Sequence, residues 1–198
     1  MSFINKKYNF EQGKFKAVVI GGSAGSFQVV TKILSEINPN FDLPIFLALH
    51  RLKHVRNGFI EALSLKSKLP IEEPEDKQNI KKGVVYLAPA NYHMGVELGY
   101  RFCLSTEEMV NNSRPSIDIT FESCSYVYKN KILGIMLTGA NKDGAWGMKK
   151  LKDRGGMTVV QEPTECVVDT MVKGAMESTT IDYVLPTSEI IKLLNSIN

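Results

Sequence analysis

Residues 18–25 read VVIGGSAG, an apolar run that ends in two glycines, one serine and the pair Ala-Gly. Such a run, rich in Val and Ile and stopped by small residues, predicts a buried strand followed by a tight turn. The glycine spacing does not give the G-x-G-x-x-G of a dinucleotide-binding turn, and the chain has no Gly-Lys-Ser/Thr triplet of a phosphate-binding loop. The stretch does fit G-x-S-x-G, with Ser23 between Gly21 and Gly25. That motif mounts a nucleophilic serine on a sharp strand-to-helix turn, although the same small residues also form ordinary turns.

Apolar runs and helical spacings alternate along the rest of the chain. The runs predict strands over 15–21, 44–49, 81–88, 131–138, 157–161 and 182–186. The spacings predict helices over 26–37, 56–67, 116–129, 145–156, 169–177 and from 187 onward, and a hairpin over 91–104. We therefore predict an α/β fold: a doubly wound, mostly parallel sheet with helices on both faces and a small antiparallel hairpin as an insertion or at the edge. We expect residues 1–14 to be a loose lead-in and 15–198 to form a single domain.

Composition narrows the class of protein. The 198 residues include 24 Lys and Arg and 21 Asp and Glu, and the formal charge of +3 is too small to indicate a nucleic-acid-binding protein. The three cysteines have no spacing typical of a zinc site or a disulfide framework, so we expect reduced thiols and no zinc site. Residues 1–10 lack the apolar segment typical of a signal peptide, and no apolar run approaches the ~18 residues of a membrane span. We expect a protein of the cytoplasm that does not insert into a membrane.

A serine nucleophile needs a base and an orienting acid. His50 directly follows the predicted strand 44–49, at the same sheet edge as Ser23, although it also fits an ordinary histidine at a strand end. His54 lies in a polar loop, and His93 fits either a rim or a core position. Asp143 follows the predicted strand 131–138, where it could also cap the next helix. The order Ser, His, Asp differs from the Ser, Asp, His of α/β-hydrolases.

Six blocks of the chain, in order, resemble the catalytic domain of the CheB-type protein-glutamate methylesterases of bacterial chemotaxis. They are AVVIGGSAGS, LALHRLKHVRNGF, GVVYLAPANYHM, RPSIDITFES, GIMLTGANKDGAWGMKKLKDRGG and VVQEPTECVVDTMVKGAMES. The resemblance implies that Ser23 is the nucleophile, His50 the general base and Asp143 the orienting acid. It places His93 near the rim of the site.

The resemblance also implies a reaction and its partners. The reaction is hydrolysis of glutamate γ-methyl esters on chemoreceptors through an acyl-enzyme, with deamidation of glutamines by the same chemistry and no metal or organic cofactor. Many such enzymes carry a receiver domain before the esterase, whereas only about 14 residues precede the first predicted strand here. We therefore expect a constitutive enzyme, one gated by a separate receiver or kinase chain, or a piece of a longer arrangement.

Several positions in the serine turn, around His50 and in the loop before Asp143 depart from the family's usual pattern. Ala24 stands where a hydroxyl residue usually follows the nucleophile, and Ala140 stands where a methionine is usual. The backbone around Gly22, Ala24 and Ala140 is then what remains to stabilise an oxyanion. These changes motivate one alternative, a non-catalytic receptor-binding module of the same fold. Another alternative is an esterase for a different substrate.

The basic loop over residues 51–56 follows the predicted base. Arg51, Lys53, His54 and Arg56 could dock an acidic receptor surface, or they could form an ordinary solvated loop.

Overall fold

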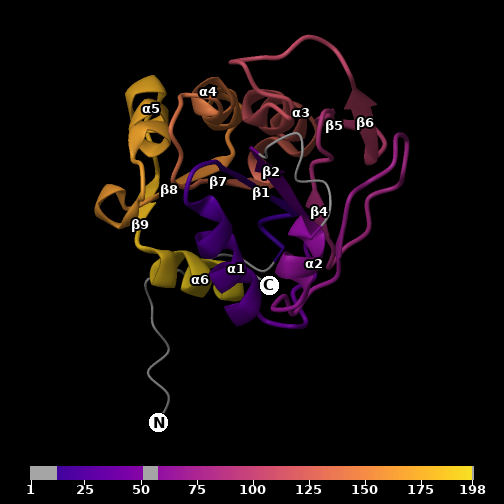
Figure 1. Ribbon diagram of the computed structural model, residues 1–198, viewed down its shortest axis with the longest axis horizontal. Helices are drawn as coiled ribbons and strands as arrows, with labels where there is room; N and C mark the ends of the chain where they lie inside the picture. The colour runs from indigo at the N-terminus through magenta and orange to yellow at the C-terminus, as the bar shows by residue number, and fades with distance from the viewer. Residues whose placement is uncertain (1–12, 51–57, 198) are drawn as a thin grey trace.

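The computed structural model describes residues 13–50 and 58–197 and contains a seven-stranded sheet in which every pairing is parallel (Figure 1). Its order is β3-β4-β2-β1-β7-β8-β9. The strands are β1 (Ala17–Gly22), β2 (Ile45–Leu49), β3 (Ile71–Glu72), β4 (Val85–Leu87), β7 (Ile132–Met136), β8 (Met157–Gln161) and β9 (Tyr183–Leu185). The α/β class and the parallel sheet are confirmed, while the two-residue strand β3 was not predicted.

Helices cover both faces of the sheet, as predicted. In Figure 1, α1 (Ser26–Glu36), α2 (Phe59–Ser64) and α6 (Thr187–Ser196) lie on one face. The other face carries α3 (Ile117–Tyr128), α4 (Ala145–Asp153) and α5 (Thr170–Ser178). A short 3₁₀ helix, η1 (Lys129–Lys131), follows α3, and a second, η2 (Pro163–Glu165), lies between β8 and α5.

Strand β1 is the centre of this sheet. Side chains of β1 alternate between two cores: Val18 and Ile20 pack under α1 and α6, and Ala17 and Val19 pack under α3 and α4. Because both faces are covered, the strand is apolar throughout instead of alternating with polar residues. This explains why residues 17–22 form an uninterrupted apolar run.

The predicted hairpin forms a sheet of its own. Strands β5 (His93–Glu97) and β6 (Arg101–Ser105) pair antiparallel and do not join the edge of the main sheet. Met94, Val96 and Phe102 turn into the core beneath α3 instead. The hairpin is therefore an insertion, the first of the two arrangements predicted, and its apolar side chains are buried against the helix layer.

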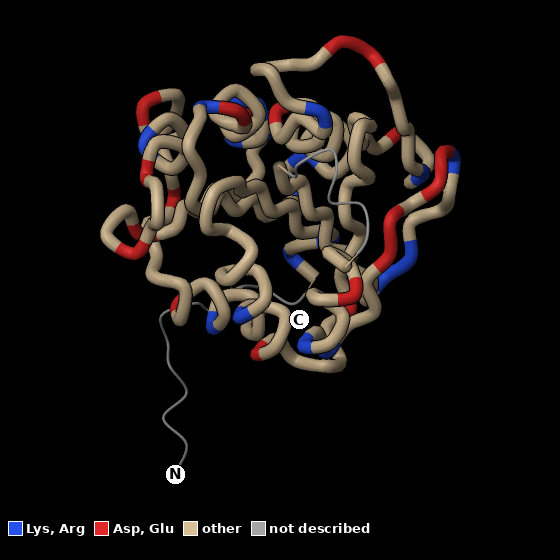
Figure 2. Tube along the Cα trace, viewed as in Figure 1, with Lys and Arg blue, Asp and Glu red and all other residues tan. Residues whose placement is uncertain are grey.

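The chain direction changes beside β1. From β1 the chain moves through β2 to β4 on one side and then returns to β7 on the other side of β1. Ligands of open α/β sheets bind at the carboxyl ends of the strands where the order reverses in this way. Figure 2 shows the charged residues on the outer helices and loops, with the strands around β1 free of them. The fold thus predicts a functional site in the loops that follow β1, β2 and β7.

Gly21 allows α3 to pack closely on β1. A Cβ at this position would lie 2.5 Å from Cγ2 of Ile117 and 3.0 Å from the ring of Phe121. We predict that Gly21→Ala lowers the free energy of unfolding by about 1–3 kcal/mol, as expected for an overpacked core, and urea denaturation measures it.

Gly95→Ala is the matched control, because a Cβ at Gly95 meets its nearest atom at an ordinary 3.5 Å. Its stability should change by no more than about 0.5 kcal/mol. Equal losses in the two variants would show that the contact with α3 is not the constraint.

Candidate active site

The residues expected to carry the chemistry come from three neighbouring strands. Ser23 follows β1, His50 follows β2, and Asp143 lies in the loop after β7. Backbone pairing continues past the strand ends, because Ser23 N–H donates to Thr138 O at 2.9 Å and His50 N–H donates to Gly22 O at 3.1 Å. The parallel sheet therefore presents all three segments at one edge.

The turn after β1 is held tightly around Ser23. The carbonyl of Ser23 accepts from the backbone N–H of Ser26 at 3.0 Å and from its hydroxyl at 2.7 Å. Gly25 caps α1 with a φ of 82°, and a Cβ there would lie 2.6 Å from Cβ of Val167. Gly139 faces the turn from the loop after β7, where an added Cβ would lie 3.0 Å from Cβ of Ser23. Ser23 itself is half-buried, at the corner between strand and helix.

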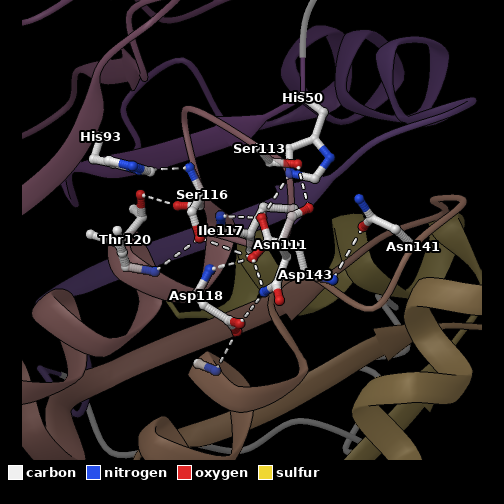
Figure 3. Close-up of polar contacts among 12 residues, drawn as sticks. His50, His93, Asn111, Ser113, Ser116, Ile117, Asp118, Thr120, Asn141 and Asp143 are labelled. Carbon is white, nitrogen blue, oxygen red and sulfur yellow. Dashed lines mark hydrogen bonds and ion pairs between the residues drawn. The ribbon is translucent and has the colours of Figure 1, made fainter. Parts of the chain in front are cut away.

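His50 is joined to Asp143 by a short hydrogen bond (Figure 3). The distance from His50 Nε2 to Asp143 Oδ2 is 2.7 Å, with the His50 side chain 14% exposed and that of Asp143 fully buried. A neutral imidazole carries one N–H, which here serves the carboxylate at Nε2. The lone pair available to accept a proton is then on Nδ1.

Asp143 is a buried carboxylate surrounded by donors. Besides His50, Oδ2 accepts from the N–H of Ile117 at 2.7 Å. Oδ1 accepts from the hydroxyl of Ser116 at 2.9 Å, the amide of Asn111 at 3.0 Å and the N–H of Asp118 at 3.3 Å. Ser116, Ile117 and Asp118 form the start of α3, where the helix dipole favours a negative charge.

Two effects compete over the ionisation of Asp143. Burial by itself raises the pKa of this carboxyl, but the hydrogen bonds from His50, from Asn111 and from the N–H of Ile117 outweigh it. The pKa of Asp143 therefore lies below the ordinary value for an aspartate. The residue is an anion at neutral pH.

This arrangement also answers the question of whether Asp143 caps a helix. The next helix, α4, begins after Gly144, and Asp143 makes no side-chain capping bond to it. Gly144 has a φ of 96°, and a Cβ on it would overlap the side chains of Met136 and Ile117. The carboxylate is turned instead to the start of α3, a helix that precedes it in the chain.

His93 lies in the core and not at the rim. It is 1% exposed, its Nε2 bonds to the carbonyl of Glu108 at 2.9 Å, and its Nδ1 accepts from Ser116 N–H at 3.2 Å. Since Nδ1 accepts, Nε2 carries the proton and the ring is neutral. Of the two positions that the sequence left open for His93, rim and core, the side chain takes the core. His93 contacts Asp143 only indirectly, because it accepts from the N–H of Ser116, whose hydroxyl donates to Asp143.

The other candidate positions differ in exposure. Ala24 and Ala140 are exposed at the edge, and the carbonyl of Ala24 accepts from the hydroxyl of Thr138 at 2.9 Å. Gly22 is the buried last residue of β1, with its carbonyl occupied by His50 N–H. The basic positions Arg51, Lys53, His54 and Arg56 lie outside the described residues, so their interpretation stays a prediction.

Sequence reasoning missed three residues of this site: Asn111, Ser116 and Asp118. The apolar spacing did predict a helix over 116–129, and Ser116 is the N-cap of α3. Nothing in the sequence showed that this helix start would meet Asp143. Asn111 reaches the site from a loop whose position depends on the tertiary structure.

A cavity among the described residues lies away from Ser23, His50 and Asp143. It has a volume of about 550 Å³, and Lys16 and Pro44 in its lining precede β1 and β2, so it opens at the amino ends of the strands. Within residues 13–50 and 58–197 there is no group of three or more His, Cys, Asp or Glu placed to hold a metal ion. Over the same ranges, no helix combines the length and apolar composition needed to cross a bilayer.

Known proteins match both the sequence and the structure. The family model for CheB methylesterase matches residues 18–194. The chain is 42% identical over 179 residues to a Leptospira interrogans protein assigned as a protein-glutamate methylesterase/protein-glutamine glutaminase, covering 90% of this chain and 93% of that one. It is 34% identical over 186 residues to the Clostridium acetobutylicum enzyme of the same name, covering 92% of this chain and 54% of that protein. The chain thus spans nearly all of the first relative and about half the length of the second.

The structural comparison agrees. The crystal structure of the Thermotoga maritima CheB methylesterase catalytic domain is similar with a TM-score of 0.88 and 33% sequence identity, covering 93% of this chain and 99% of that chain. The family match, the similar crystal structure and the sheet order agree, and the chain therefore belongs to the CheB methylesterase family.

Proposed function

We propose that the chain is a serine esterase that hydrolyses the γ-methyl esters of glutamyl side chains on chemoreceptors. The names of its relatives support the reaction, and the hydrogen bond between His50 and Asp143 at the sheet edge that bears Ser23 is the observation that carries it. Asp143 fixes the imidazole with its Nδ1 lone pair available, which is what a serine nucleophile needs from its base.

In this mechanism the Ser23 hydroxyl attacks the ester carbonyl while His50 Nδ1 takes its proton. The tetrahedral intermediate collapses, the C–O bond to the methoxy group breaks, and His50 returns the proton to release methanol. Water then attacks the acyl-enzyme with the same assistance, which frees Ser23 and leaves a glutamate carboxylate. When the substrate is a glutamine, ammonia leaves in place of methanol.

Asp143 stabilises the imidazolium that forms on His50 and does not itself take the proton. Its lowered pKa and its fixed orientation at the start of α3 serve this role. The oxyanion would be held by backbone N–H groups of the serine turn. With Ala24 after the nucleophile, no side-chain hydroxyl at that position assists them.

The partner in this proposal is a methylated chemoreceptor, with a separate receiver or kinase chain as the source of regulation. A cytoplasmic location is part of the proposal, and the three unpaired cysteines favour it because disulfides are rare in that compartment.

Ser23→Ala should lower methanol release from methylated receptor membranes by about 10³-fold or more, because no other hydroxyl replaces the nucleophile. A fluorophosphonate probe, which labels only an activated serine, should lose its reaction with the variant. Circular dichroism should show an intact fold, since Ser23 is only half-buried.

Ser35→Ala is the control, because Ser35 lies at the far end of α1 and bonds only to the backbone of its own helix. It should label and turn over like the wild type. Undiminished turnover in Ser23→Ala would refute the proposed nucleophile, and an unlabelled wild-type protein would favour the non-catalytic module.

The pKa of Asp143 predicts a pH dependence of stability. Because the pKa is lower in the folded state, this residue contributes stability above the ordinary aspartate pKa of about 3.9, and the contribution is lost as the pH falls through the lower folded value. Between about pH 6 and pH 3, the free energy of unfolding should therefore fall more in the wild type than in Asp143→Asn. Urea denaturation at both pH values measures the difference. Parallel losses would show that Asp143 is not held as a stabilised anion.

A further inference from the structure

Asn111 joins two buried carboxyl groups through one nitrogen. Its Nδ2 donates to Asp118 Oδ2 at 2.8 Å and to Asp143 Oδ1 at 3.0 Å, and Figure 3 shows its side chain between the two. An amide nitrogen carries two hydrogens, so these bonds use both. The mechanism above assigns no role to this residue.

The two carboxyl groups that Asn111 joins disfavour each other's charge. Burial raises the pKa of Asp118, and the charge of Asp143 raises it further. A hydrogen bond from the N–H of Gly147 to Asp118 Oδ1, 2.7 Å long, partly offsets this rise. A neutral double donor satisfies both groups without adding a charge. Among the described residues, the titratable groups around Asp143 are His50 from the end of β2 and Asp118 from α3.

The bonds to Asp143 divide its two oxygens between two tasks. Oδ2 accepts from His50 and from Ile117 N–H, while Oδ1 accepts from Asn111, Ser116 and Asp118 N–H. Anchoring Oδ1 restricts rotation of the carboxylate about its Cβ–Cγ bond. The direction in which Oδ2 meets the imidazole then depends on the donors to Oδ1.

The loop that carries Asn111 is shaped by other contacts. Residues 110–113 form a tight turn in which Val110 and Ser113 exchange backbone hydrogen bonds, with φ values of 51° at Asn111 and 58° at Asn112. Two central residues with positive φ define a type I′ turn, which asparagine favours. The Arg114 guanidinium also holds the carbonyls of Thr106 and Glu107, at 2.6 and 2.8 Å. Both asparagines suit the turn, but only Asn111 reaches the carboxylates.

We propose that Asn111 is a positioning residue for the esterase: it orients the Asp143 carboxylate toward His50 by donating to Oδ1 while satisfying Asp118. This inference rests on the proposed function, because it assigns Asn111 a role in activating the same serine. Asn111 acts through Asp143 and His50 and is not itself a catalytic residue.

The test compares Asn111→Ala, Asn111→Asp and Asn112→Ala in the full chain, with methylated receptor membranes as substrate. Asn112→Ala is the matched control, because Asn112 also has a positive φ in the same turn and is exposed like Asn111, but makes no bond to the carboxylates. Asn111→Ala should lower kcat about 10-fold with KM within about twofold, since a bond to a charged group is lost away from the substrate. Asn111→Asp should lower kcat further, because it keeps the shape and the turn but replaces both donors by a third carboxyl. Asn112→Ala should keep the wild-type kcat.

A kcat for Asn111→Ala within twofold of the wild type, even with a lower melting temperature, would overturn the inference and leave Asn111 a turn residue. A higher kcat for Asn111→Asp than for Asn111→Ala would overturn it as well. If circular dichroism shows that Asn111→Asp does not fold, the pair Asn111→Ala and Asn112→Ala decides. Activity retained in Ser23→Ala would refute the esterase itself, whereas an inactive Ser23→Ala beside a fully active Asn111→Ala refutes only the positioning role.

Discussion

The candidate site depends on one buried anion. Asp143 is fully buried and accepts five hydrogen bonds, and the donors come from the end of β2, from the loop before α3 and from the first residues of α3. Such a charge is tolerated in the interior only when it is this well satisfied. In return, each donor group is held where the carboxylate requires it. The anion therefore fixes the position of His50 and of the start of α3 together.

Glycine makes this convergence of segments possible. Gly21 and Gly144 both face Ile117, whose N–H donates to Asp143, and a Cβ at either would lie within 2.6 Å of the Ile117 side chain. Gly139 similarly leaves room beside Ser23. With larger residues at these positions, α3 and the loop after β7 would be pushed away from the end of β1. The small residues near the serine motif thus serve packing across the site as well as the turn.

The geometry also differs from the serine protease arrangement in one respect. There the histidine donates to its aspartate through Nδ1 and uses Nε2 as the base, whereas here Nε2 of His50 faces Asp143. In the proposed mechanism the two ring nitrogens of His50 therefore exchange tasks, with Nδ1 left as the base. The chemistry requires one nitrogen for each partner, and either assignment meets that requirement.

The sequence by itself determined the alternation of strands and helices, the serine turn and the family. The spacing of apolar residues, the small residues of the turn and the order of the motifs are all local properties of the chain. Ser23, His50 and Asp143 could also be placed at one sheet edge, since parallel strands bring their carboxyl ends together. Only the tertiary structure decided that Asp143 meets the start of α3 and not its own helix, that His93 lies in the core, and that the hairpin forms a separate sheet. It alone brought in Asn111, 32 residues from Asp143 along the chain. Those contacts follow from how the helix layer packs on the sheet, and no pattern within one segment encodes them.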